Sequence, residues 1–303
     1  MSLSRRRFLH AGLAACAGLP LAAAGAPAIE PIRRTGKPHL RLSLAAYSFR
    51  KYLDLKLKPK PPMTLDDFVD LAASLELDAV EPTAYYFADT SPAYLARLKG
   101  HCSRLGLDVS GTAVGNDFCT PDADKLKGQI AHVKKWAEIA AALGAKTVRI
   151  FAGGVARGDT EEKARRRCVA AIEEACDHAA KVGVYLALEN HGGITGTIDQ
   201  ILALVQAVRH DWFGVNLDTG NFRSADPYAD LARLAPYAVT VQIKTEVQPK
   251  GKKKEDADLK RLLDILRSAH YRGYVALEYE AAEDPKTGVP RAVAALRKLV
   301  REG

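Results

Sequence analysis

Four consecutive apolar segments in the second half of the chain each end in a side chain that could do chemistry. The first, residues 184–188, ends in Glu189, and His191 follows two residues later. The next three end in Asp218, in Gln242 followed by Lys244, and in Glu278. Short apolar runs of this kind predict buried parallel strands. Because a buried carboxylate is costly unless a cation lies opposite it, these strand ends are candidate functional positions.

The side chains at these positions share one kind of donor atom, oxygen. The carboxyl ends of the strands of an α/β barrel meet at one mouth, so we expect the four groups to lie together. Three carboxylates so close would raise one another's pKa values unless a cation were bound. Glu189, Asp218, Glu278 and the amide oxygen of Gln242 suit Mg²⁺ or Mn²⁺ better than Zn²⁺. The sequence therefore predicts a site for a divalent metal.

The elements that must position these groups alternate between strand and helix from Leu40 onward. The predicted strands are 40–49, 78–81, 108–114, 146–151, 184–189, 213–218, 238–243 and 274–278. The predicted helices are 64–76, 91–105, 122–143, 160–182, 197–208, 228–234, 256–269 and 288–300. Such alternation predicts a parallel sheet, and eight repeats in roughly 265 residues match an α/β (β/α)₈ barrel over residues 40–303. The alternative, a doubly wound open sheet, lacks a Gly-rich phosphate loop after its first strand.

Four motifs carry a resemblance to a known family: Leu188-Glu189-Asn190-His191, Asn216–Asn221, Val241-Gln242-Ile243-Lys244 and Leu277-Glu278-Tyr279-Glu280. The chain resembles the sugar phosphate isomerase/epimerase family, the xylose isomerase-like TIM barrels, over essentially all of residues 40–300. The resemblance implies one divalent metal held by Glu, Asp, His and Glu at strand ends. By position the ligands here would be Glu189, Asp218, Gln242 and Glu278, with Gln242, a weaker ligand, in place of the usual histidine. It also implies that this barrel forms homo-oligomers.

The resemblance further implies that Glu189 and Glu278 move a proton on a sugar carbon beside a carbonyl, through a metal-stabilised enediolate. The candidates for binding the substrate's oxygen atoms are His191, Lys244, Arg149 on the fourth strand and Glu81 at the end of the second. Three of these residues have a structural alternative: His191 could orient Glu189, and Arg149 could pair with Glu81 inside the barrel.

The leading function is a secreted sugar isomerase or epimerase acting on a free sugar or derivative. Two alternatives remain open. The same base and metal could serve a lyase that opens a 3-keto-glycoside, and the barrel could be a non-catalytic sugar-binding protein.

Residues 1–28 read as a twin-arginine export signal. Arg5-Arg6-Arg7-Phe8-Leu9 precedes an apolar run, residues 11–24, that is too short and alanine-rich for a membrane span. Cleavage is best placed at Ala26-Pro27-Ala28, although Cys16 lies in a lipoprotein-like site that would leave a lipid anchor. We therefore expect a periplasmic or secreted protein, with residues 29–39 as a linker.

The net charge argues against one class of partner, and the cysteine content indicates free thiols. Removing residues 1–28 lowers the formal charge from +8 to +5 (8 − 3), too little to suggest a nucleic-acid binder. The four cysteines beyond Cys16 are predicted to be buried free thiols. Two lysine-rich loops, Lys56–Pro62 and Lys250–Lys254, could form a cationic rim at the mouth or be plain solvated loops.

Overall fold

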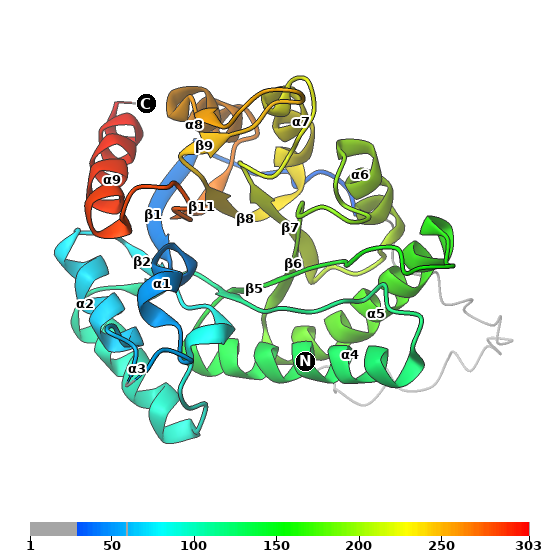
Figure 1. The fold of residues 1–303 in the computed structure, drawn as a ribbon, viewed down its shortest axis with the longest axis horizontal. Helices are drawn as coiled ribbons and strands as arrows, with labels where there is room; N and C mark the ends of the chain where they lie inside the picture. The colour runs from blue at the N-terminus through cyan, green and yellow to red at the C-terminus, as the bar shows by residue number, and fades with distance from the viewer. Residues whose placement is uncertain (1–28, 59, 303) are drawn as a thin grey trace, which may run out of the picture.

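The computed structural model describes residues 29–58 and 60–302 of the chain, so the predicted export signal and Cys16 lie outside the described residues. A ring of parallel strands is surrounded by helices (Figure 1). The strands of the ring are β1 (His39–Ala45), β2 (Ala79–Glu81), β3 (Asp108–Val109), β4 (Thr112–Ala113), β5 (Thr147–Ile150), β6 (Tyr185–Glu189), β7 (Phe213–Asp218), β8 (Ala238–Ile243) and β11 (Arg272–Leu277). The (β/α)₈ barrel predicted from the alternation is confirmed.

The sheet runs β3-β2-β1-β11-β8-β7-β6-β5-β4, so the first and last strands of the ring, β1 and β11, pair in parallel. The predicted third strand, 108–114, is divided: β3 pairs with β2, whereas β4 pairs with β5. Ser110 and Gly111 lie between the two halves. A Cβ on Gly111 would lie 2.4 Å from Thr147 Oγ1, so glycine lets the chain pass close to β5 as it changes partner.

Capping residues mark where several of the helices begin. The predicted helices are found as α2 (Leu65–Ser74), α3 (Pro92–Arg104), α4 (Ala123–Leu143), α5 (Glu161–Val182), α6 (Ile198–Ala207), α7 (Pro227–Leu234), α8 (Leu259–Ser268) and α9 (Pro285–Arg301). Thr64 and Thr197 each form a capping box at the start of α2 and α6. Helix α8 begins three residues later than predicted because β10 (Glu255–Asp256) pairs with β9 (Glu246–Val247) and Asp258 caps the helix.

Short turns that the sequence pattern does not predict follow the first two strands and α7. They are η1 (Ala46–Phe49), α1 (Arg50–Leu53), η2 (Ala84–Tyr86) and η3 (Ala235–Tyr237). The turns after β1 and β2 place Tyr47 and Tyr85 beside the mouth of the barrel.

The barrel interior is unusually polar near the carboxyl ends of the strands. Buried polar side chains on the strands of the ring include Ser43, Glu81, Thr112, Arg149, Glu189, Asn216, Asp218, Thr240 and Gln242. The apolar side chains of the strands and the helices form one large core cluster. This arrangement leaves charged groups inside the barrel, so each of them needs a partner.

Residues 29–38 lie across the opposite end of the barrel. The Ile32 N–H donates to Pro236 O at 3.0 Å, and the Arg34 guanidinium donates to Ala238 O while lying over the Tyr271 ring. Ile29 and Ile32 share a hollow with residues at the amino ends of β6, β7 and β8. The chain therefore enters the barrel at the end away from the candidate site.

Two further sequence-based expectations concern the described residues. Cys102, Cys119, Cys168 and Cys176 are buried free thiols, as predicted. Across residues 29–58 and 60–302, no helix combines the length and apolarity needed to cross a membrane.

Candidate active site

A cavity of about 410 Å³ opens at the carboxyl ends of the strands. Its lining consists of charged, amide and aromatic side chains: Tyr47, Tyr85, Arg149, Phe151, Glu189, His191, Asn221, Arg223, Lys244, Lys254, Glu278 and Glu280. Five of the eight residues predicted to form the site are in this lining. Glu81, Asp218 and Gln242 are buried and are not part of it. The volume suits a small polar ligand such as a sugar.

Glu189 ends β6 on one wall of the cavity and is held from two sides. Arg149 Nε lies 2.9 Å from Glu189 Oε2, and Asn221 Nδ2 donates to Glu189 Oε1 at 2.9 Å. Arg149 itself is fixed, because its Nη1 donates to Val114 O at 2.8 Å and its guanidinium lies over Phe151. Burial raises the pKa of Glu189 to about 7 although Arg149 opposes the shift. A carboxyl group with that pKa can gain and lose a proton near neutral pH.

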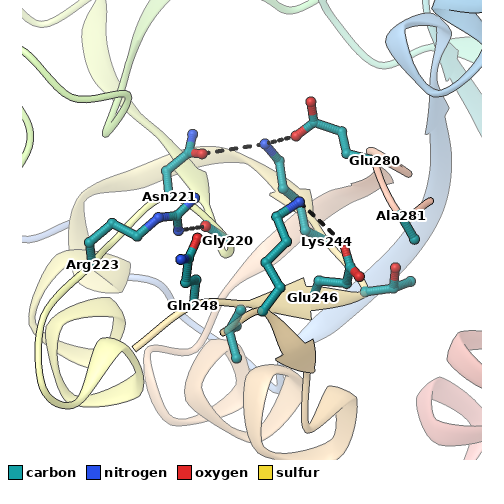
Figure 2. Close-up of a pocket in the computed structure, with 11 residues that line it drawn as sticks. Gly220, Asn221, Arg223, Lys244, Glu246, Gln248, Glu280 and Ala281 are labelled. Atoms are coloured by element: carbon teal, nitrogen blue, oxygen red, sulfur yellow. Dashed lines mark hydrogen bonds and ion pairs between the residues drawn. The ribbon is translucent and has the colours of Figure 1, made fainter. Parts of the chain in front are cut away.

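Lys244 follows β8 and gathers carboxylates from two other strands. Its Nζ lies 3.1 Å from Asp218 Oδ2 and 3.2 Å from Glu278 Oε2, and it also donates to Glu280. Figure 2 shows Lys244 between Asn221 and Glu280, with Gly220 beside it. Burial alone would lower the pKa of Lys244, but the surrounding carboxylates raise it well above its ordinary value. The carboxylates therefore favour the charged form of Lys244.

Gln242 points away from this cluster. Its Nε2 donates to Glu81 Oε1 at 2.6 Å, and its Oε1 accepts from Asn216 Nδ2 at 2.6 Å. Burial raises the pKa of Glu81 to about 7, since only the Gln242 amide and more distant Arg149 oppose it. The Arg149–Glu81 ion pair that the sequence allowed as an alternative is not formed, because Arg149 pairs with Glu189.

His191 follows β6 by two residues and is the exposed member of the group. Its ring packs on Phe151 with the ring centroids 4.3 Å apart. The face of the ring packed on Phe151 is shielded from water, and this partial burial, together with the charges of Arg149 and Lys244, lowers the pKa of His191 to about 4. At neutral pH it is an uncharged group that can both donate and accept hydrogen bonds.

A second hollow of about 290 Å³ continues from the cavity at Phe151 and His191. Its remaining lining comes from Asn116, Ala152, Gly153, Gly154, Gly192, Gly193 and Thr195, in the loops after β4, β5 and β6. The loops after β5 and β6 are joined, because Ile194 N donates to Gly153 O at 3.1 Å. The two hollows have Phe151 and His191 in common, so they are neighbours at the carboxyl ends of the strands.

The four groups predicted as metal ligands do not surround one open position. Glu189 is paired with Arg149, Asp218 and Glu278 are paired with Lys244, and the Gln242 oxygen accepts from Asn216. Within the described part of the chain, no three His, Cys, Asp or Glu side chains are arranged to hold a metal ion. The donor set as it stands does not fit a divalent cation.

Several residues of the site carry only weak sequence signals. Asn221 lies three residues after Asp218, and Glu280 lies two residues after Glu278, so both could be found by extending the strand-end argument into the loops. Tyr47 and Tyr85 lie in short 3₁₀ turns, where the sequence does not distinguish a cavity wall from the core. Among the described residues of the two lysine-rich loops, only Lys254 contributes to the cavity lining. Its Nζ lies 3.3 Å from Glu246 Oε2.

Comparison with known proteins identifies the family. The model of the family described as xylose isomerase-like TIM barrel matches residues 69–299, about three quarters of the chain. The chain belongs to this family. No curated protein matches the chain.

Three solved structures share the fold at low sequence identity. A D-psicose 3-epimerase has 17% identity and a TM-score of 0.68, covering 86% of this chain and 97% of its own. A 3-keto-D-glucoside 4-epimerase from E. coli has 16% identity and a TM-score of 0.66, covering 86% and 100%. A xylose isomerase-like TIM barrel protein from Mycobacterium smegmatis in complex with magnesium has 16% identity and a TM-score of 0.67, covering 86% and 96%.

Proposed function

We propose that the protein is a sugar isomerase or epimerase that transfers a proton at a carbon beside a carbonyl. The observation that carries the proposal is the pair of buried carboxylates, Glu189 and Glu278, in the lining of one polar cavity. They come from β6 and from the end of β11, which are separated in the ring by β7 and β8. Two carboxylates on different walls can reach opposite faces of one substrate carbon.

In the proposed reaction one glutamate removes the proton from the carbon, and the electron pair of that C–H bond forms the C=C bond of an enediolate. The other glutamate can return a proton to the opposite face, which inverts the carbon. Glu189 is suited to either step because its pKa is raised to about 7. The buried carboxyl group of Glu278 also has a raised pKa, which burial causes and Lys244 opposes.

The intermediate needs a positive charge beside its oxygen. Magnesium is present in one relative of the same fold, and a divalent ion, Mn²⁺ or Mg²⁺, is our sequence-based prediction for this chain. The buried positive groups in the cavity lining are Arg149 and Lys244, and His191 is a neutral hydrogen-bonding group for hydroxyls.

Proton exchange followed by NMR tests the proposal. The protein is incubated in D₂O with a panel of ketoses and 3-keto-glycosides, and Glu189→Gln and Glu278→Gln are compared with the exposed control Glu255→Gln. We expect deuterium to enter beside the carbonyl, with a loss of at least about 100-fold in each site variant and none in the control. Ligand binding without exchange in the intact protein would instead indicate a non-catalytic sugar-binding barrel.

A lyase acting on 3-keto-glycosides is the second candidate, and the hollow beyond Phe151 and His191 favours it. That hollow offers room for the group attached to the sugar, and the same enediolate could expel this group. The structural neighbour that acts on a 3-keto-D-glucoside is consistent with such a substrate class. The products of the exchange experiment distinguish the candidates, because only the lyase releases the attached group.

Export through the twin-arginine route is part of the proposal and rests on the sequence of residues 4–28. Arg5→Lys with Arg6→Lys and Arg7→Lys should retain the protein in the cytoplasm, which cell fractionation would measure. A Cys16→Ala variant that remains processed at Ala28 would argue against a lipid anchor.

A further inference from the structure

The side chains around Lys244 are those expected of a cation-binding site, and the cation they surround is the ammonium group of Lys244 itself. Oxygen atoms of Asp218, Glu278 and Glu280 surround its Nζ, and Asn221 Oδ1 lies 3.4 Å away. These oxygens come from the ends of β7 and β11 and from the loops that follow them. An ammonium group has three N–H donors. Those of Lys244 make hydrogen bonds to Glu280 and Asn221, and the carboxylates of Asp218 and Glu278 lie at ion-pair distance.

We infer that the Lys244 ammonium takes the place of the divalent cation in this chain. The inference rests on the proposed function, because it assigns to Lys244 the charge that the enediolate oxygen needs. A divalent ion at the same carboxylates would lie within a few ångströms of the ammonium and be repelled by it. It would also lack the fourth predicted ligand, because the Gln242 amide is engaged with Glu81 and Asn216.

The surrounding chain is shaped for the long side chain of Lys244. Its N–H donates to Thr219 Oγ1 at 2.9 Å, which fixes the backbone at the end of β8. A Cβ on Gly220 would lie 2.7 Å from Lys244 Cδ, so glycine at this position leaves the path of the side chain open. Figure 2 shows Gly220 next to Lys244. The lysine is therefore built into the site by its neighbours as well as by its charge partners.

The geometry gives the ammonium a direct role in the reaction. Lys244 lines the same cavity as Glu189 and Glu278. When a glutamate removes the carbon-bound proton, negative charge develops on the former carbonyl oxygen, and an N–H of Lys244 can donate to that oxygen. The proton returns from a glutamate to carbon, so Lys244 begins and ends the cycle protonated. No external co-reactant is needed.

Binding of Mn²⁺ tests the inference without relying on turnover. Chelator-treated protein is titrated with Mn²⁺, and the loss of the free-ion signal is followed by electron paramagnetic resonance. We expect the intact protein to bind Mn²⁺ with a dissociation constant above about 1 mM. Lys244→Met frees the carboxylates, so it should bind Mn²⁺ at least about tenfold more tightly. The matched variant Lys254→Met, which removes another cavity lysine, should show no such gain.

Stoichiometric, micromolar Mn²⁺ binding by the intact protein would overturn the inference, whether or not Lys244→Met folds. Equal Mn²⁺ affinities in the intact protein and a folded Lys244→Met would also overturn it. Where exchange activity is found, the chelator-treated protein should retain it, and a requirement for added Mn²⁺ or Mg²⁺ would contradict us. Absence of exchange with every substrate would remove the proposed reaction, while the Mn²⁺ titration would still report on the cation site.

Discussion

The carboxyl groups of the site differ in what holds them, and this difference sets their chemistry. Glu189 is paired with a guanidinium, Glu278 with an ammonium, and Glu81 only with the neutral amide of Gln242. Glu81 is therefore the carboxyl group whose charge is compensated least. Burial raises its pKa to about 7, so it is expected to be protonated in the folded protein under mildly acidic conditions.

Glu81→Gln should stabilise the protein in a pH-dependent way. The pKa of Glu81 is higher in the folded protein than its ordinary value. The stability that its protonated form contributes is therefore complete below about pH 4.5 and is lost as pH rises towards 7. Glutamine resembles the protonated acid and keeps an acceptor for Gln242. The stability of the variant relative to the wild type should therefore rise by roughly 2–3 kcal/mol between pH 5 and pH 8 in urea unfolding. Glu255→Gln, on the surface, should follow the wild type, and parallel curves for Glu81→Gln would refute this assignment.

Sequence reasoning identified five residues of the cavity lining but not how they pair, and it did not identify Arg223 or Glu280. The strand-end argument places Glu81, Arg149, Glu189 and Gln242 in one layer, because strand periodicity and barrel topology are enough for that. Whether Arg149 reaches Glu81 or Glu189 depends on side-chain direction, which its bond to Val114 O and its stacking on Phe151 determine. Those contacts join separate loops and leave no pattern in the sequence.

Among the elements, the loops after β5 and β6 depend on close backbone contact. Gly193 has φ +55°, and a Cβ there would lie 2.1 Å from Gly153 O and 2.8 Å from Gly153 C. Gly192 also has a positive φ, +94°, but a Cβ there would meet open space. A substitution at Gly192 would therefore cause backbone strain alone, whereas one at Gly193 would also cause a steric clash with Gly153.

Gly193→Ala should cost about 2–4 kcal/mol of unfolding free energy, because the backbone of Gly153 cannot yield without moving its loop. Gly192→Ala should cost about 1–2 kcal/mol, from its backbone conformation alone. Thermal or urea unfolding measures both. The loops form the hollow beyond His191, so Gly193→Ala should also raise KM for a glycoside more than for a free ketose. Equal costs for the two variants would show that the loops can separate.

Element types and order were predictable because hydrophobic periodicity and capping residues are local signals. β7 and β8 have the predicted bounds, and α4 and α5 begin one residue after theirs, at Asp122 and Thr160 caps. The division of the third strand was not predictable, since it depends on Gly111 passing Thr147 on a neighbouring strand. The turns after β1 and β2 were missed because three or four residues carry no readable period.

Over the whole molecule, the barrel is closed by pairing of β1 with β11 and covered at its amino end by residues 29–38. Arg34 links this segment to β8 through Ala238 O and lies over the buried Tyr271 ring, 5.3 Å from its centroid. Its neighbour Arg33 is exposed. The segment predicted as a linker thus contacts residues in the last third of the chain.

Arg34→Ala should lower stability by about 1–2 kcal/mol, through loss of the bond to Ala238 and the contact with Tyr271. Arg33→Ala should change it by less than about 0.5 kcal/mol. Differential scanning calorimetry would show a lower Tm for Arg34→Ala, with exchange activity unchanged because the site is at the other end. A Tm equal to that of Arg33→Ala would mean that the segment is not part of the folded unit.

The position of residues 29–38 also decides at which end of the barrel anything attached before them is joined. The chain joins the barrel beside the amino ends of β6, β7 and β8, whereas the cavity opens at the carboxyl ends. A lipid at Cys16, or a tag used to tether the protein to a surface, would therefore be connected to the barrel on the side away from the mouth. Substrate would approach from the bulk phase rather than along the membrane, and immobilisation through the amino terminus should leave the rate of substrate capture unchanged.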